Sequence, residues 1–370
     1  MNKKITWTIV AAAVIILLAF LMTTNNTPHR KTMHTIGVIS PLTGWGAYWG
    51  EGYNKGIALA VDEIRAKGGN VDVVIEDGGT DAQKSATAAQ KLINIDKVNA
   101  LTVEFAGPSS SVSPIALKAG IPLVYDAVVK KFVNENPNAF KFYFDVAKQC
   151  GIAGDYLAEH GSKNIALVSI NLDFAPECQT ALDAVAIRHG IKVTPYLFGE
   201  DMTDFKTTIS KMKTAGVDSI IPVFYEDHAV SFFKQKGDLR FNVPVFTGLG
   251  IPDVFTEKVR SSVATSSLEG VITFDQPLST EFKSNIQKKY PAITEKDFIP
   301  AAYGYDEIIY LYGGMSKCAQ NDTSCIVSEM KKDAHKGALQ SAGFGDDRIF
   351  DMDPVYYRYS GGKLVEFPLK

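Results

Sequence analysis

Features that mark catalytic, metal-binding and nucleic-acid-binding proteins are missing from this sequence. It has no GxSxG, HExxH, P-loop or EF-hand motif, and none of its six histidines lies in a suggestive context beside a cysteine or serine. Its net charge of −3 leaves no basic excess to attract a nucleic acid. We therefore expect no catalytic residues, no metal, no cofactor and no nucleic-acid partner.

Long apolar runs are also absent, except at the N-terminus. There Lys3 and Lys4 precede the uncharged stretch ITWTIVAAAVIILLAFLM. A secretory signal has a shorter core of about 7 to 15 residues and a small-x-small cleavage site, whereas the following FLMTTNNTPHRK offers neither such a site nor a cysteine for lipid attachment. We expect segment 1–28 to hold an uncleaved membrane anchor at residues 5–22, with a cleaved signal as the alternative. Because the two lysines would stay in the cytoplasm, the rest of the chain is expected in the periplasm or on the outer face of the cytoplasmic membrane.

Cysteine is scarce, with only Cys150, Cys178, Cys318 and Cys325 present. A zinc site would need CxxC pairs or nearby histidines, and the histidines here are scattered. An exported chain, however, lies where disulfides persist. The segment CAQNDTSC therefore favours a disulfide between Cys318 and Cys325, and a bridge between Cys150 and Cys178 is the less favoured of the two.

What the sequence does contain is a regular alternation of strand-like and helical segments. The runs TIGVIS, VDVVIED and VNALTVEF are separated by the helical patterns GYNKGIALAVDEIRAKGG and AQKSATAAQKLINI. Such alternation predicts an α/β fold with parallel sheets covered on both faces. The pattern breaks at NENPNAFKFYFD and then resumes, and 370 residues are enough for two cores. We expect two doubly wound, Rossmann-like lobes, with a β-hairpin formed by PVYYRYSGGKLVEF at the end.

The segment PLTGWGAYWGEG, residues 41–52, is the first candidate site. It follows the first predicted strand, where open parallel sheets bind ligands. Its glycines allow close backbone approach, and Trp45, Tyr48 and Trp49 offer ring faces for stacking. The alternative is that these rings fill the space between the loop and the next helix. The spacing of the glycines does not match GxGxxG, so a dinucleotide is not indicated.

The segment VEFAGPSSSVSP, residues 103–114, is the second candidate. Gly107 precedes Pro108 as an N-cap would precede a proline in the first helical position. The free N–H groups of such a helix end favour a carboxylate or another anion. Capping by the serine hydroxyls is the alternative interpretation. Further predicted strand ends supply the side chains of Asp126, Asp173, Phe174, Tyr225 and Glu226.

Two consecutive segments resemble the start of type I periplasmic binding proteins, in particular the leucine-binding, branched-chain amino acid type of ABC importers. They are IGVISPLTGWGAYWGEGYNKGIALAVDEIRAKGG and VDVVIEDGGTDAQKSATAAQKLI. The resemblance covers about residues 35–367. It implies a monomer with two α/β lobes, joined by a three-crossing hinge, that close on a small ligand. Lobe 1 would comprise residues 35–144 and 275–345, and lobe 2 residues 145–274 and 346–370.

The resemblance also implies roles for particular positions. The family's ligand-packing aromatic falls on Trp49, with Trp45 and Tyr48 beside it. The loop that binds the ligand carboxylate matches FAGPSSS, and its contacts fall on the following residues: Phe105, Ala106, Gly107 and Ser109. Two lobe-2 aromatic positions fall on Phe174 and Tyr225.

Two departures from the family pattern bear on the ligand. The loop that usually offers a hydroxyl reads Asp126, Ala127, Val128, and the acid that usually meets the ligand ammonium falls near Leu249. A buried ammonium without a partner would be costly. Either Glu226 or Asp126 replaces the missing acid, or the ligand is not a standard amino acid.

From the resemblance we expect an extracytoplasmic solute-binding protein. It would capture an amino acid, an amide or a compound like an aromatic acid between its lobes, and deliver it to the membrane subunits of an ABC permease. A ligand-sensing receptor module of the same fold is the alternative, and an enzyme is the least favoured class.

Overall fold

The structure is a computed structural model that describes residues 33–44, 46–333, 337–340 and 343–369. The expected anchor at residues 5–22 and the side chain of Trp45 lie outside these residues. Within them, no helix is both long enough and apolar enough to cross a membrane. Residues His34–Lys370 form one compact unit.

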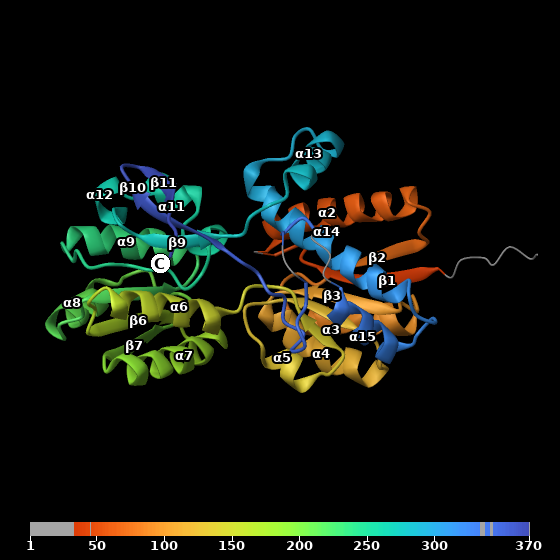
Figure 1. Cartoon of the computed structure of the whole chain (residues 1–370), viewed down its shortest axis with the longest axis horizontal. Coiled ribbons are helices and arrows are strands. Elements are labelled where there is room, and N and C mark those ends of the chain that lie inside the picture. Colours follow the sequence, from red (N-terminus) through yellow and green to blue (C-terminus); the bar gives the residue numbers. More distant parts are fainter. Residues whose placement is uncertain (1–32, 45, 334–336, 341–342, 370) are drawn as a thin grey trace, which may run out of the picture. The chain divides into compact units, whose positions relative to one another are not determined.

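A five-stranded sheet with all strands parallel organises the first half of this unit (Figure 1). Its strands are short and largely apolar, and three of them are buried at every position, as expected of a sheet covered on both faces. In spatial order they are β2 (Val71–Asp77), β1 (His34–Ser40), β3 (Ala100–Glu104), β4 (Leu123–Asp126) and β5 (Ala139–Lys141). We call this sheet and its covering helices the first lobe. The helices are α2 (Ala47–Ala66), α3 (Ala82–Asn94), α4 (Ala106–Ala119), α5 (Lys131–Glu135), α13 (Thr280–Lys289), α14 (Glu295–Met315) and α15 (Thr323–Lys332).

Helices α2 and α14 cross at unusually short range, although they are far apart in the sequence. A Cβ atom built on Gly56 would lie 1.8 Å from the carbonyl oxygen of Ala301, and one built on Gly304 would lie 2.2 Å from that of Tyr53. Only glycine leaves room for such an approach. The crossing holds α14 against the first lobe and brings its polar side chains above the sheet.

The second lobe is built on a parallel sheet that continues into an antiparallel one. Strands β6 (Asn164–Ile170), β7 (Lys192–Phe198) and β8 (Ser219–Val223) are ordered β7-β6-β8. Bridges from Val245 to Ile220 and from Phe246 to Ile272 link β8 to β9. Strands β9 (Ile272–Asp275), β10 (Val355–Ser360) and β11 (Lys363–Glu366) are antiparallel, so the predicted terminal hairpin is present. The helices of this lobe are α6 (Val146–Glu159), α7 (Phe174–His189), α8 (Lys206–Thr214), α9 (Glu226–Asp238), α10 (Ile251–Val254), α11 (Glu257–Ser262) and α12 (Thr265–Leu268).

Three segments of chain connect the two lobes. Residues 142–145 join β5 to α6, residues 276–279 join β9 to α13, and residues 351–354 lead to β10. Just before the last of these, Ile349 bridges to Lys141 beside β5. The connections are visible near the centre of Figure 1. The α/β class with parallel sheets is therefore confirmed, whereas the residue boundaries expected for the lobes stay a prediction.

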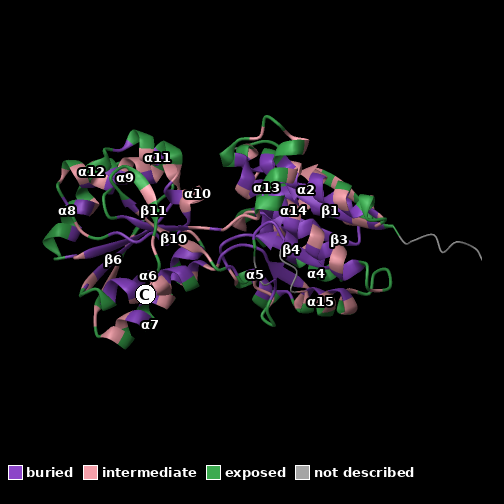
Figure 2. Ribbon diagram, turned by 45° about the horizontal axis from the view of Figure 1, so that its top comes forward, coloured by how far each residue is buried: buried purple, intermediate pink, exposed green. Residues whose placement is uncertain are grey.

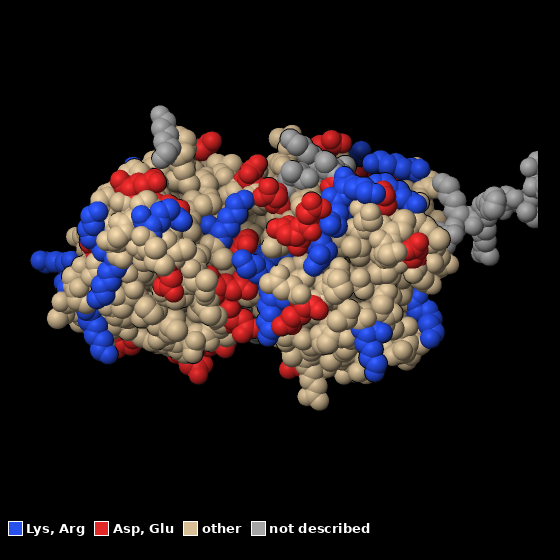
Figure 3. Space-filling view, turned by 60° about the horizontal axis from the view of Figure 1, so that its bottom comes forward, with Lys and Arg blue, Asp and Glu red and all other residues tan. Residues whose placement is uncertain are grey.

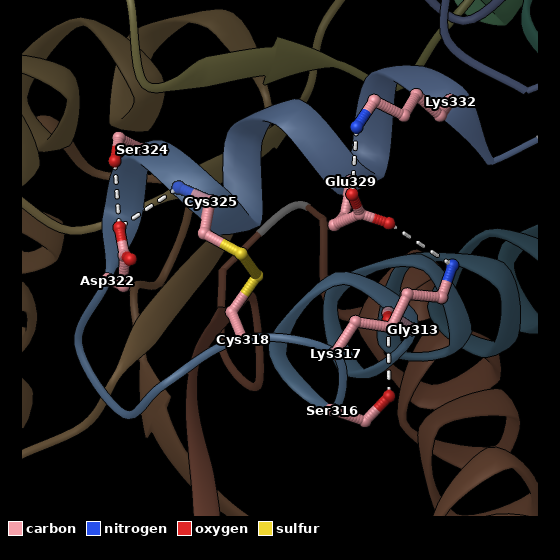
Figure 4. Close-up of a disulfide and its surroundings, with 9 residues drawn as sticks. All are labelled: Gly313, Ser316, Lys317, Cys318, Asp322, Ser324, Cys325, Glu329 and Lys332. Carbon is pink, nitrogen blue, oxygen red and sulfur yellow. Dashed lines mark hydrogen bonds and ion pairs between the residues drawn. A yellow bond between two sulfur atoms is a disulfide. The ribbon is translucent and has the colours of Figure 1, made fainter.

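Two disulfides are present. Cys318 and Cys325 close a short loop between α14 and α15, and Asp322 caps α15 by accepting a hydrogen bond of 3.0 Å from the Cys325 N–H (Figure 4). Cys150 and Cys178 join α6 to α7, and both are fully buried. The pair that the sequence favoured less is thus formed as well.

The cores of both lobes lie around the sheets, whose strands are mostly buried while the outer faces of the helices are exposed (Figure 2). On the face shown in Figure 3, basic and acidic side chains are mixed over both lobes. This mixture agrees with the net charge of −3 and differs from the basic stripe of nucleic-acid-binding proteins.

Candidate functional site

Two carboxylates lie side by side where β3 and β4 end. Glu104 and Asp126 are register partners, so their side chains leave the same face of the sheet. They are 2% and 5% exposed, and β1 places the fully buried Ser40 next to Glu104. Both carboxylate oxygens of Glu104 and the Oδ2 atom of Asp126 have no hydrogen-bond partner among the described residues. The end of this sheet therefore holds acceptors that the protein itself leaves unsatisfied.

The electrostatics of this pair are governed by burial and by like charge. Desolvation raises the pKa of Glu104 well above its usual range, and the negative charges of Asp126 and Glu307 add to the rise, while the nearby Ser40 hydroxyl opposes it. Desolvation also raises the pKa of Asp126, with Glu307 adding to the effect and the Lys141 ammonium opposing it. In the free protein these carboxyl groups therefore hold protons far more tightly than exposed ones do.

Glu307 approaches the pair from α14, across the crossing with α2. Its Oε2 atom accepts a hydrogen bond of 2.6 Å from the Tyr53 hydroxyl and another from the Thr102 hydroxyl. Its Oε1 atom is buried without a partner. Burial raises the pKa of Glu307 to about 8, against the opposing effect of the two hydroxyl donors.

Aromatic rings surround Trp49 near the same strand ends. The Trp49 ring lies 5.8 Å from that of Tyr303, 6.3 Å from that of Tyr143 and 6.5 Å from that of Phe105. Asp126 lies close enough for its charge to raise the pKa of both tyrosines, after the larger effect of desolvation. Trp49, which the sequence predicted as a ligand contact, is thus 6% exposed and packed among other rings.

A hydrogen bond connects this cluster to the second lobe. The Tyr143 hydroxyl, in the first connecting segment, donates to Oδ2 of Asp253 in α10 at 3.0 Å. Asp253 as a whole is partly exposed, yet desolvation of its carboxyl raises its pKa to about 7. Tyr48 is 58% exposed, and the charges of Asp253, Glu226 and Glu104 raise its pKa in addition to desolvation. Tyr48 therefore lies near acids of both lobes.

The predicted residues of the second lobe are a pair of aromatic rings and two acids. Phe174 is buried, and its ring lies 6.1 Å from that of Tyr225 in an edge-to-face arrangement, while Asp173 is exposed. Glu226 pairs with the Lys258 ammonium at 3.1 Å and accepts a hydrogen bond from the Thr256 hydroxyl at 2.5 Å. Its charge is therefore already compensated, which makes it a poorer replacement for the family's missing acid than Asp126.

The remaining predicted residues have apolar side chains, so they can offer a ligand only apolar contacts or backbone groups. Leu249 is fully buried, and its carbonyl accepts from Thr247 at 2.7 Å. Ala127 and Val128 are buried directly after β4. No carboxylate therefore stands at Leu249, where the family resemblance expected the acid.

Gly107 was expected to be the N-cap of the helix that follows β3, and this is wrong. Helix α4 begins at Ala106 with Phe105 as its N-cap, at φ 68° and ψ 150°. This region of backbone conformation is almost restricted to glycine, so Phe105 is held under strain. The Ser109 hydroxyl donates to the Phe105 carbonyl at 2.6 Å, one turn back along the helix, and no side chain among the described residues caps the first N–H groups of α4, so the alternative of capping by the serine hydroxyls is wrong as well.

The structure thus brings Trp49, Phe105 and Asp126 together, and Phe174 with Tyr225. It adds residues that the sequence reasoning missed, namely Glu104, Tyr143, Asp253, Tyr303 and Glu307. The signal for Glu104 was available, since it is an acid that ends an otherwise apolar strand. Within the described part of the chain, no group of His, Cys, Asp and Glu side chains is arranged to hold a metal ion.

Comparison with known proteins identifies the family. Residues 34–354 match the family model described as periplasmic binding protein. A Leu/Ile/Val-binding protein homologue from Brucella abortus is 26% identical over 315 residues, covering 80% of this chain and 82% of that protein.

Solved structures share the fold. A leucine-binding protein from Thermotoga maritima has a TM-score of 0.77 at 19% identity, covering 91% of this chain and 98% of that one. An ABC-transporter solute-binding protein from R. palustris, solved in complex with benzoate, has a TM-score of 0.73 at 18% identity, covering 90% of this chain and 95% of that one. The chain therefore belongs to the type I periplasmic binding proteins, a family of solute-binding proteins.

Proposed function

We propose that this chain is the extracytoplasmic solute-binding protein of an ABC importer. It captures a small organic ligand between its lobes and delivers it to the permease subunits in the membrane, and it performs no chemistry itself. The observation that carries the proposal is the 3.0 Å hydrogen bond that Tyr143, in the connecting segment next to the strand ends of the first lobe, donates to Asp253 in α10 of the second lobe.

Closure of the lobes on the ligand follows from this arrangement. A ligand that contacts Trp49 in the first lobe and Tyr225 in the second has contacts in a closed state that an open state lacks. Its binding energy then shifts the equilibrium towards closure. The three connecting segments, 142–145, 276–279 and 351–354, would act as the hinge, with the lobes divided as the family resemblance implies.

The ligand is expected to have an apolar body and a polar group. Trp49, Phe174 and Tyr225 supply ring surface, and the unsatisfied acceptors near Asp126 supply polar contacts. The Brucella relative is named for leucine, isoleucine and valine, and the R. palustris protein was solved with benzoate. Amino acids, amides and small aromatic compounds are therefore the classes to test.

A thermal-shift screen of the full chain in detergent tests the proposed function. Binding to the folded state stabilises it by about 2.7 kcal/mol at a hundredfold excess of ligand over Kd. At least one compound from these classes should raise the Tm in a saturable manner. If every compound leaves the Tm unchanged, the solute-binding function is wrong for this chain.

Attachment to the membrane is part of the proposal. The apolar stretch at residues 5–22 would remain on the mature protein as its anchor. Mass spectrometry of the protein extracted from host membranes should then give the mass of the whole chain. A mass that lacks the first 26 to 28 residues would instead identify a cleaved signal.

A further inference from the structure

The pair formed by Glu104 and Asp126 has no counter-ion of its own. No lysine or arginine in the described part of the chain forms an ion pair with either residue. Lys141 is the nearest source of positive charge, but its ammonium donates to the carbonyl oxygens of Tyr143 and Phe144 at 2.6 Å each. Two adjacent buried carboxylates without a cation cost several kcal/mol if both are ionised.

The groups that face the pair from neighbouring elements are acids and neutral groups, apart from Lys141, whose ammonium is already hydrogen-bonded to backbone carbonyls. Helix α14 contributes Glu307, which acts on both carboxyl groups, and α10 contributes Asp253, which acts on Asp126. Helix α2 contributes Tyr53, which is hydrogen-bonded to Glu307, and β5 contributes Lys141, which is already engaged. The connecting segment contributes Tyr143, whose hydroxyl is occupied by Asp253. Apart from the Ser40 hydroxyl of β1, which lies near Glu104, these groups of the described chain do not satisfy the acceptors of the pair.

The apolar surroundings also favour positive charge. The ring of Trp49 packs edge-to-face with those of Phe105 and Tyr143, and Tyr143 lies close enough to Asp126 for their charges to interact. The faces of aromatic rings carry negative electrostatic potential. Tyr48 lies near Glu104, Glu226 and Asp253. An ammonium or amidinium group would find hydrogen-bond acceptors and rings together here, and it would favour ionisation of the carboxyl groups that an anion would disfavour.

We propose, building on the solute-binding function proposed above, that the ligand of this protein is an organic cation whose ammonium or amidinium group binds between Glu104 and Asp126. The apolar body of the ligand lies against Trp49. The two carboxylates accept the N–H groups of the ligand, which satisfies the buried oxygens that the protein leaves without partners.

Three probes of the same shape and different charge test this inference on the full chain. Benzamidine is a cation, benzamide is neutral and benzoate is an anion, and all three carry the same ring. A hydrogen-bonded charge contributes more than a neutral hydrogen bond, so calorimetry should give a Kd for benzamidine at least about tenfold below that for benzamide. Benzoate should not bind measurably.

Protonation gives a second readout. Burial raises the pKa of both carboxyl groups, and a bound cation favours their ionised forms, so binding should be coupled to proton release. Calorimetry in two buffers of different ionisation enthalpy measures this release, and the affinity for benzamidine should fall as the pH is lowered.

Isosteric variants locate the site. Glu104→Gln and Asp126→Asn should each weaken benzamidine binding at least about tenfold and reduce the proton release. Glu63→Gln is the matched control, because Glu63 accepts hydrogen bonds from Asn285 and Tyr305 away from the pair. If a variant fails to fold, the order of the three Kd values on the unaltered protein still decides the question.

The outcomes separate this inference from the proposed function. Tighter binding of benzoate or leucine than of benzamidine overturns the cationic ligand and leaves solute binding intact. Unchanged benzamidine affinity in both isosteric variants also overturns it. Failure of every tested compound, charged or neutral, overturns the proposed function itself.

Discussion

Glu104 and Asp126 are paired in register at the carboxyl ends of β3 and β4, and the described residues provide neither with an ion-pair partner. Parallel strands bring such residues to one sheet edge, where this fold binds ligands. Ionisation of the pair is therefore unfavourable in the free protein, and its oxygens can accept hydrogen bonds from a ligand. Several consequences can be measured without knowledge of the natural ligand.

The unliganded protein should lose stability as the pH rises. An acid whose folded pKa is raised binds its proton more tightly in the folded state, so its stabilising effect is complete below the unfolded pKa and is lost through the folded pKa. For Glu307 this window runs from its usual value of 4.5 to about 8. Urea unfolding should therefore give a lower free energy of unfolding at pH 8 than at pH 5. The variant Glu307→Gln should show a flatter dependence over the same window, and an identical slope in the variant would contradict this assignment.

The two disulfides should differ in their contribution to stability. Loop closure in the unfolded state depends on the residues between the cysteines, which are separated by 28 positions for Cys150–Cys178 and 7 for Cys318–Cys325. Replacing both cysteines of a pair by alanine should cost about 3.6 kcal/mol for the first and about 2.4 kcal/mol for the second. Urea unfolding of the two double variants measures both values. A larger loss for the shorter loop would show that contacts around the cysteines outweigh loop entropy.

The crossing of α2 and α14 should not tolerate a side chain. In Gly56→Ala the new Cβ would meet the Ala301 carbonyl oxygen at 1.8 Å, so the helices must separate. Such overpacking costs typically about 1 to 3 kcal/mol. Because Glu307 lies on α14, benzamidine binding should weaken as well.

Gly151→Ala is the control for that substitution. Gly151 lies inside α6, and a Cβ there would meet no atom within 4 Å. Alanine should stabilise this helix by about 0.5 to 1 kcal/mol, because glycine costs backbone entropy in helices. Equal destabilisation by both alanines would show that the crossing is not the cause.

Much of the fold could be predicted from local patterns. The alternation of TIGVIS and VDVVIED with helical segments predicts parallel strands, because short strands separated by helices are typical of parallel sheets. The strand in TIGVIS is almost wholly buried, whereas VDVVIED lies at the edge of the sheet and is mostly half-buried or exposed. The turn in SGG, where Gly361 and Gly362 have positive φ, predicts the terminal hairpin for a similarly local reason. The helix after β3 was misplaced because Phe105 adopts a conformation that its sequence does not favour.

The site was harder to predict because its residues meet through strand register and a helix crossing. Asp126 was expected at a strand end, but its neighbour Glu104 depends on the pairing of two strands 22 positions apart in the sequence. Glu307 comes from a helix about 200 residues further on. Such long-range pairings leave no local signal, although an acid at the end of a buried strand is itself unusual.

The most direct test of this account is a crystal structure of the full chain with benzamidine bound. We predict that the amidinium nitrogens lie within hydrogen-bonding distance of Glu104 and Asp126, with the ring of the ligand against Trp49 and both lobes in contact with it. Benzamidine bound elsewhere, with the two carboxylates still facing each other without a partner, would contradict the account.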